Sequence, residues 1–310
     1  SAMFAQYDWA DAGVGVEWDE ATGTATDQMG NTYVVGNFTG ASKTFATVSG
    51  PVTFSSAGGS MDFFVIKYAP GGVIAWVQRF GGTGIEEAYR VSTAANGLVA
   101  IVGAFSSSSL TIPGLPAIPN TGGLDGFLLV LREDGSPVWV RGVGGSMTDR
   151  YLDVHMTETS IVAVGSMTSS FAMPGGGGPL TNLGAAGSSD ILIAKFDLDG
   201  NVDWRFNYGG TGDEQANGVA VNGNRVYMAG IWAPLFAGPL TLGSKSSGAS
   251  YGGADAFCAA FEIEDGNTFH WVRNVGGATT DRFDDVTTDK IGGVYCHGTS
   301  FSPVFYDGIS

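Results

Sequence analysis

Apolar and polar residues alternate with a period of two through many short segments of this chain, and no segment shows the periodicity of a helix. The apolar segments are rich in Val, Ile, Phe, Tyr and Trp, which are the residue types favoured in strands. Gly-Gly, Asn-Gly and Asp-Gly pairs separate them, and such pairs form the tight turns of hairpins. The pattern predicts an all-β protein of short antiparallel strands.

One motif recurs five times: a tryptophan, a glycine-rich turn, a carboxylate ten residues after the tryptophan, and an apolar strand that ends on glycine. Successive tryptophans are 67, 63, 65 and 67 residues apart. Self-similarity at a fixed period indicates a repeat architecture. The members are the tryptophans Trp9, Trp76, Trp139, Trp204 and Trp271, the carboxylates Asp19, Glu86, Asp149, Glu214 and Asp281, and the glycines Gly36, Gly103, Gly165, Gly230 and Gly298.

Each repeat is predicted to hold four strands. The first is an alternating strand such as 89–94 or 217–222, and the tryptophan lies on the fourth. The second, more apolar strands are expected at 32–38, 98–105, 160–167 and 225–232. The third strands open on aspartate, at 62–68, 125–131, 190–196 and 255–261. Longer segments separate the second strand from the third, at 37–61, 104–124, 166–189 and 231–254, and the echoes of Gly-Pro-Leu-Thr within them indicate a short extra strand or turn.

Four-stranded units of about 65 residues in tandem are typical of β-propeller blades, because a ring gives both faces of each sheet a neighbour. The motifs AWVQRFGGTGIEEAYRV (75–91), DILIAKFDLDGNVDW (190–204) and MGNTYVVGNFTG (29–40) resemble the bacterial beta-propeller repeat family, often called SBBP. The resemblance covers nearly the whole chain. It implies a secreted or cell-surface propeller and no shared reaction.

We therefore expect one domain over residues 1–310, a five-bladed β-propeller of four-stranded antiparallel blades; residues 1–3 are interpreted as a cloning remnant. The chain begins with a tryptophan strand and ends after the second strand of the fifth repeat, so the closing blade is predicted to be shared by the two termini. Its third strand is missing from the pattern. Either PVFYDG (303–308) supplies it or the native protein continues past Ser310.

Composition excludes several classes of partner. Acidic residues outnumber basic ones 30 to 14, and a net charge of −16 argues against binding nucleic acid or an anionic membrane. No apolar run approaches the roughly 18 residues of a membrane-spanning helix. The acidic balance suits a secreted or cell-surface protein, with the export signal absent from this sequence, and leaves the oligomeric state open.

Candidate chemistry is sparse. The chain has no nucleophile, phosphate-binding or zinc motif, and the strand residues His155 and His297 are interpreted as core or hydrogen-bonding groups. Cys258 and Cys296 lie in apolar segments as small core residues, and a disulfide between them stays open. Asp197, Asp199, Asn201 and Asp203 imitate the start of a calcium loop, although a plain turn is favoured because the later glutamate ligand is missing.

The loop from each fourth strand to the next repeat is expected on the same face as the four long segments. That face is the predicted ligand surface, because loops on a rigid scaffold commonly carry recognition. Its carboxylates either fix their turns by accepting backbone hydrogen bonds or attract a cation such as Ca²⁺; no cofactor is otherwise expected. The candidate ligand-binding residues are Asp19, Glu86, Asp149, Glu214, Asp281, Trp18 and Trp232.

The sequence thus favours a non-catalytic, extracellular or cell-surface binding or adhesion module for a glycan or a protein ligand. A five-bladed glycosidase-like enzyme with two axial carboxylates is the first alternative. A structural repeat segment of a larger surface protein is the second.

Overall fold

In the described residues the chain is all-β, as predicted: it contains 25 strands and no helix. The strand pairs are antiparallel, apart from a single parallel bridge between Thr47 and Ile74. The computed structural model describes residues 19–40, 42–173, 178–184, 187–233, 239–289, 291–303 and 306–307.

Four sheets share one order of four strands. The first sheet is β1 (Asp19–Thr26), β2 (Thr32–Phe38), β5 (Asp62–Ala69) and β6 (Val73–Phe80). The second is β7 (Glu86–Thr93), β8 (Leu98–Phe105), β11 (Asp125–Arg132) and β12 (Pro137–Val143). The third is β13 (Asp149–Met156), β14 (Ser160–Met167), β15 (Asp190–Asp197) and β16 (Val202–Tyr208). The fourth is β17 (Asp213–Asn222), β18 (Arg225–Ala233), β21 (Asp255–Glu262) and β22 (Phe269–Gly276).

The fifth sheet has two strands in the described residues, β23 (Asp281–Thr288) and β24 (Val294–Ser300). The strand β25 (Tyr306–Asp307) pairs with β22 of the fourth sheet. Tyr306 and Asp307 of PVFYDG thus extend the fourth sheet, which contradicts the alternative in which this segment supplies the third strand of the fifth repeat. Residues 4–10, predicted to close the ring, lie outside the described residues.

The long segments between second and third strands fold into short hairpins, as the Gly-Pro-Leu-Thr echoes predicted. Phe171 and Leu180 form an isolated bridge in the third repeat. The hairpins of the other repeats are β3 (Lys43–Thr47) with β4 (Gly50–Phe54), β9 (Ser109–Leu110) with β10 (Ile118–Pro119), and β19 (Pro239–Leu242) with β20 (Lys245–Ala249).

The first strand of every repeat contains a β-bulge opposite the glycine of the second strand. In the second repeat the ladder shifts between Ala88 and Arg90, opposite Gly103. A Cβ at Gly103 would lie 1.9 Å from the carbonyl oxygen of Glu87, so any side chain would push the two strands apart. The repeated glycine is therefore required by the close approach of two backbones.

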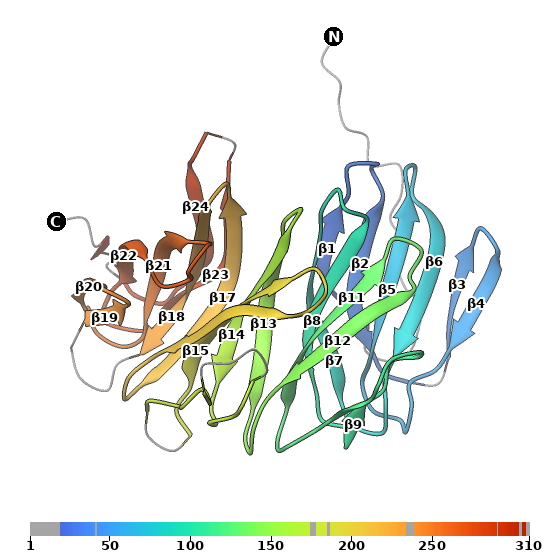
Figure 1. The fold of residues 1–310 in the computed structure, drawn as a ribbon, viewed down its shortest axis with the longest axis horizontal. Helices are drawn as coiled ribbons and strands as arrows, with labels where there is room; N and C mark the ends of the chain where they lie inside the picture. Colours follow the sequence, from blue (N-terminus) through green and yellow to red (C-terminus); the bar gives the residue numbers. More distant parts are fainter. Residues whose placement is uncertain are drawn as a thin grey trace, which may run out of the picture.

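Successive sheets pack face to face. We call the face turned toward the next sheet in sequence the forward face, and the other the rear face. Tyr33 and Val35 on the forward face of β2 join Val99 and Ile101 on the rear face of β8 in one buried cluster. The same alternation places a cluster between each later pair of sheets. Figure 1 shows the sheets following one another along the long axis, from the first at one end to the fourth and fifth at the other.

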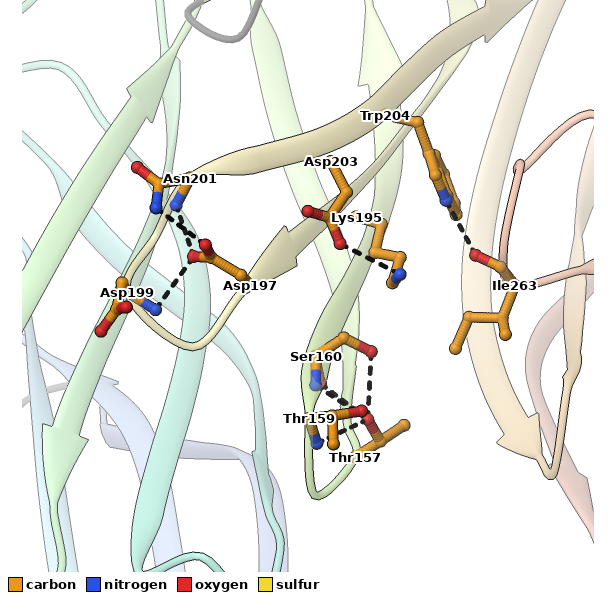
Figure 2. A network of polar contacts seen from close by, with 10 residues as sticks. All are labelled: Thr157, Thr159, Ser160, Lys195, Asp197, Asp199, Asn201, Asp203, Trp204 and Ile263. Atoms are coloured by element: carbon orange, nitrogen blue, oxygen red, sulfur yellow. Dashed lines mark hydrogen bonds and ion pairs between the residues drawn. The ribbon is translucent and has the colours of Figure 1, made fainter.

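The four described repeat tryptophans, Trp76, Trp139, Trp204 and Trp271, occupy equivalent places on the fourth strands, as predicted, while Trp9 lies outside the described residues. Trp139 and Trp204 are buried, and each indole lies against the hairpin turn of the next sheet. Figure 2 shows Trp204 reaching Ile263 in this way. A Cβ at Gly266 of that turn would lie 2.6 Å from the Trp204 ring, so glycine lets the turn approach the indole.

Candidate functional site

Four of the five repeat carboxylates, at or next to the first residue of a first strand, lie inside their own turns. Each accepts a hydrogen bond from the backbone N–H of a glycine four residues earlier. The bonds are Gly82 to Glu86 (2.5 Å), Gly145 to Asp149 (2.8 Å), Gly210 to Glu214 (2.9 Å) and Gly277 to Asp281 (2.8 Å). All four carboxylates are at most 1% exposed. They fix the glycine-rich turns, which was one of the two roles expected for them.

A second buried aspartate accompanies each turn carboxylate. Asp190, the first residue of β15, accepts the backbone N–H of Leu183 at 2.7 Å and so ties the long segment to its sheet. The equivalents Asp62, Asp125 and Asp255 each accept a backbone N–H from their own long segment. A Cβ at Gly209 would lie 2.1 Å from Asp190 Oδ1 and 2.9 Å from Glu214 Oε2, so the glycine lets both carboxylates approach the turn.

Burial perturbs the Asp190–Glu214 pair of the third and fourth repeats. Burial raises the pKa of Glu214 to about 7, and the nearby carboxylates of Asp190 and Asp213 add to the rise, while the Gly210 hydrogen bond opposes it. Burial likewise raises the pKa of Asp190. The folded protein therefore favours the protonated form of these carboxyls more than an exposed acid would.

The remaining predicted ligand residues have different surroundings. Asp19 forms an ion pair with the buried Lys43 at 2.6 Å. Trp232 is 3% exposed and packs in the cluster between the third and fourth sheets with Leu240 and Phe257. Trp18 lies outside the described residues. The structure thus gives Trp232 a packing environment, pairs Asp19 with Lys43, and holds each of the other four carboxylates within its own turn.

The segment that imitates a calcium loop is a turn. Asp197 Oδ1 accepts the backbone N–H groups of Asp199 and Asn201, and Asp197 Oδ2 accepts the Asn201 amide at 2.7 Å. Asp203 pairs instead with Lys195 at 3.0 Å, away from the turn (Figure 2). Nowhere in the described ranges do three His, Cys, Asp or Glu side chains group closely enough to hold a metal ion.

A pocket of about 390 Å³ lies where the first strands of four repeats end, at the opposite end of these strands from the turn carboxylates. We call it the first-strand pocket. Polar and apolar groups share its lining about equally. The polar residues are Thr26, Asp27 and Gln28 at the end of β1, Thr93 on β7, and His155, Thr157 and Glu158 at the end of β13; Ala94, Ala95, Met156, Val221 and Gly223 complete it. Because these residues are distant in sequence and come from four sheets, the pocket is a product of the stacking.

Among the polar side chains of this pocket, His155 and Gln28 make no hydrogen bond to another described residue, and His155 is the more buried of the two. The ring is half-buried, and this burial lowers its pKa, so the imidazole is neutral at pH 7. No hydrogen bond joins it to another described residue. By contrast, Glu158 accepts the backbone N–H of Ala95 at 2.9 Å, and Asp27 accepts three hydrogen bonds from Met29 and Asn31. Burial favours a higher pKa for Asp27, but the Asn31 and Met29 hydrogen bonds outweigh it and lower the pKa.

The rear face of the first sheet carries a larger groove, of about 720 Å³, which we call the first-sheet groove. Phe38, Phe64, Ile66 and Tyr68 form its floor, and Phe45 from the β3–β4 hairpin lies against Phe64. In the second, third and fourth sheets the corresponding rear face is covered by the preceding sheet.

Sequence reasoning missed the first-strand pocket. His155 was interpreted as a core or hydrogen-bonding group, yet it is half-buried without a partner; His297, given the same role, is exposed on β24. The available signal was a polar cluster at the ends of the first strands, such as Thr26, Asp27 and Gln28. Whether these polar residues form a pocket depends on how the sheets stack.

A comparison with known protein families matched none, and a search of curated proteins found no relative of this chain. Within the part of the chain that the structure describes, no helix is long and apolar enough to cross a membrane. Functional inference therefore rests on the geometry of the two cavities and of the turns.

Proposed function

We propose that this chain is a non-catalytic binding module of the propeller type, working outside the cell or on its surface, that holds a hydroxyl-rich glycan in the first-strand pocket. The observation that carries the proposal is the partnerless, neutral imidazole of His155 in a pocket lined by four repeats. A neutral imidazole offers one donor and one acceptor, and sugar hydroxyls supply the matching groups. The SBBP resemblance is consistent with such a location and with binding rather than a shared reaction.

The rest of the lining supports the same ligand class. The hydroxyls of Thr26, Thr93 and Thr157 and the amide of Gln28 are uncharged hydrogen-bonding groups around His155. The carboxylates of Asp27 and Glu158 add acceptors for hydroxyl groups. A small number of placed polar groups in a concave site is the usual arrangement for orienting a small ligand.

The carboxyl environments favour binding over the glycosidase alternative. A glycosidase needs a proton-donating acid of raised pKa that faces the substrate. In the first-strand pocket the pKa of Asp27 is lowered. Burial raises the pKa of Asp153 to about 7, as it does for Glu214, but both side chains are buried and accept backbone N–H groups from Val219 and Gly210.

The five repeats are proposed to form a ring. The rear face of the first sheet is open at the first-sheet groove, and the forward face of the fifth sheet exposes Tyr295 (58%). At the other interfaces a forward face packs on a rear face, so these two surfaces are complementary in kind. A fifth sheet completed by residues 4–10 would cover the groove and remove the remaining sheet edges.

The test is a glycan array with the purified chain, with and without Ca²⁺, followed by calorimetry on the glycan that binds. His155→Ala is expected to weaken binding about tenfold or more with an unchanged thermal midpoint. The matched control His297→Ala changes an exposed histidine on β24 and should bind as the parent does.

Other outcomes separate the alternatives. If Leu183→Ala on the long-segment face weakens binding while His155→Ala does not, the ligand lies on the originally predicted face instead. Calcium-dependent binding would point to the acidic turns. If the array gives no binding, the glycan proposal is wrong, and a protein ligand becomes the leading alternative.

A further inference from the structure

The interface between the fourth and fifth sheets differs from the other interfaces at one repeat-equivalent pair. One member of the pair is the fourth residue of a third strand, and it lies on the forward face of its sheet. The other member is on the second strand of the next repeat, two residues before the repeated glycine of that strand, and it lies on the rear face. At the first three interfaces both members are apolar and lie in one buried cluster: Val65 with Ile101, Leu128 with Ala163, and Ile193 with Met228. At the fourth interface the pair is Cys258 with Cys296.

The two cysteines are in contact. Cys258 lies on β21, a central strand of the fourth sheet, and is 6% exposed. Cys296 lies on β24 of the fifth sheet and is half-buried. Both thiols are free in this structure, and they hydrogen-bond to each other across the interface. The hydrogen bond from Cys258 lowers the pKa of Cys296, which makes the more accessible thiol the better nucleophile.

The fifth sheet has the weakest support of the five. Its two described strands have the fourth sheet behind them, and their forward face leaves Tyr295 and Thr299 partly or largely exposed. A covalent link at this interface would hold the one of the five sheets that has the fewest strands in the described residues. No other repeat has a cysteine at either position, since Cys258 and Cys296 are the two cysteines of the chain.

We propose that Cys258 and Cys296 are a modification site, and that they form a disulfide which fastens the fifth sheet to the fourth when the protein meets a small-molecule disulfide such as oxidised glutathione. The Cys296 thiolate attacks one sulfur of that disulfide and releases one glutathione thiolate. The Cys258 thiolate then attacks Cys296 Sγ in the mixed disulfide and releases the second. The protein loses two electrons and two protons, and the small disulfide is reduced to two thiols.

The experiment compares the full chain after equilibration with oxidised glutathione and with dithiothreitol. Free thiols are counted in denaturant, and the thermal midpoint is measured in each state. The oxidised protein should have no titratable thiol, migrate as a monomer on a non-reducing gel, and melt higher by about 5 °C or more. The control is the double variant Cys258→Val/Cys296→Ile, which reproduces the Val65 and Ile101 pair and should melt identically in both reagents.

Two results would overturn the proposal. One is a wild-type protein that retains both thiols, or carries two bound glutathiones, after equilibration with oxidised glutathione in the folded state. The other is a disulfide that joins two molecules. The single variant Cys296→Ser keeps Cys258 and reports whether the buried thiol reacts alone. None of these readouts uses a ligand, so their outcome is independent of the proposed glycan binding.

Discussion

The indole N–H of Trp204 donates a hydrogen bond of 2.8 Å to the backbone carbonyl of Ile263, which belongs to the next sheet. Trp139 bonds Leu198 at 2.8 Å and Trp76 bonds Glu133 at 3.0 Å in the same way. The spacing of about 65 residues between tryptophans therefore reflects a contact that recurs between successive sheets. Each of the first three repeats thus presents its outer strand to the hairpin turn of the repeat that follows.

Trp204→Ala is expected to cost about 3–5 kcal/mol of unfolding free energy, because it removes a buried aromatic ring and leaves the Ile263 carbonyl without its partner. Trp271→Ala should cost less. Trp271 is half-buried, and within the described residues its indole has no hydrogen bond to a following turn. Urea unfolding of the two variants measures the difference, and equal losses would contradict the role assigned to the indole hydrogen bond.

Adjacent glycines of one turn should respond oppositely to the same change. Gly209→Ala would place its Cβ 2.1 Å from Asp190 Oδ1, and the resulting displacement should cost about 1–3 kcal/mol. At Gly210 a Cβ meets no atom within 4 Å and the backbone is not left-handed, so Gly210→Ala should stay within about 0.5 kcal/mol of the parent. Thermal or urea unfolding of the pair tests whether close approach explains the repeated Gly-Gly.

Stability should fall as the pH rises through the weakly acidic range. The pKa of Glu214 is about 7 in the folded protein against an ordinary value of 4.5, so the folded state binds this proton more tightly than the unfolded chain does. Below pH 4.5 the Glu214 carboxyl is mostly protonated in both the folded and the unfolded state, so it does not lower the unfolding free energy there. Between pH 4.5 and 7 the folded state loses stability, on the order of 2 kcal/mol from this group.

Glu214→Gln should remove that part of the pH dependence and leave the contribution of Asp153, whose pKa is also about 7. The amide oxygen of glutamine still accepts the Gly210 N–H. Glu86→Gln is the contrasting variant, because Glu86 accepts backbone N–H groups on both oxygens and an amide nitrogen cannot replace one of them. Urea unfolding at pH 4.5 and pH 7.5 measures this pH dependence for the parent and for both variants. A parent protein that is equally stable at both values would show that the buried acids are not protonated as inferred.

Much of the fold followed from local sequence, because strand periodicity and turn chemistry act over a few residues. Strand β2 matches the predicted range 32–38, and β5 begins on Asp62 as predicted. The first strand of the second repeat begins earlier than the predicted 89–94, at Glu86, because that residue already pairs with Phe105 of β8. Such a contact depends on a partner distant in sequence.

The candidate site was harder to predict for the same reason. The sequence of a glycine-rich turn with a carboxylate is the same whether that carboxylate faces solvent or its own backbone. Only the packing shows that Asp149 and Asp281 are fully buried. Trp232 lies beside a long segment in sequence, yet it turns into the core. The first-strand pocket needs residues from four sheets, so no single repeat contains its signature.

Closure of the ring should depend on the N-terminal residues. The sequence predicts that residues 4–10 form the outer strand of the same sheet as β24, and the first-sheet groove leaves the apolar floor of Ile66 and Tyr68 without a covering sheet in the described residues. Deleting residues 1–12 should therefore lower the thermal midpoint by several degrees, because the fifth sheet loses a strand and the groove loses its cover. Deleting residues 1–3 alone is the control and should change nothing. A 1–12 deletion that melts with the parent would mean that the stack of sheets stays open and that its stability comes from the four internal interfaces alone.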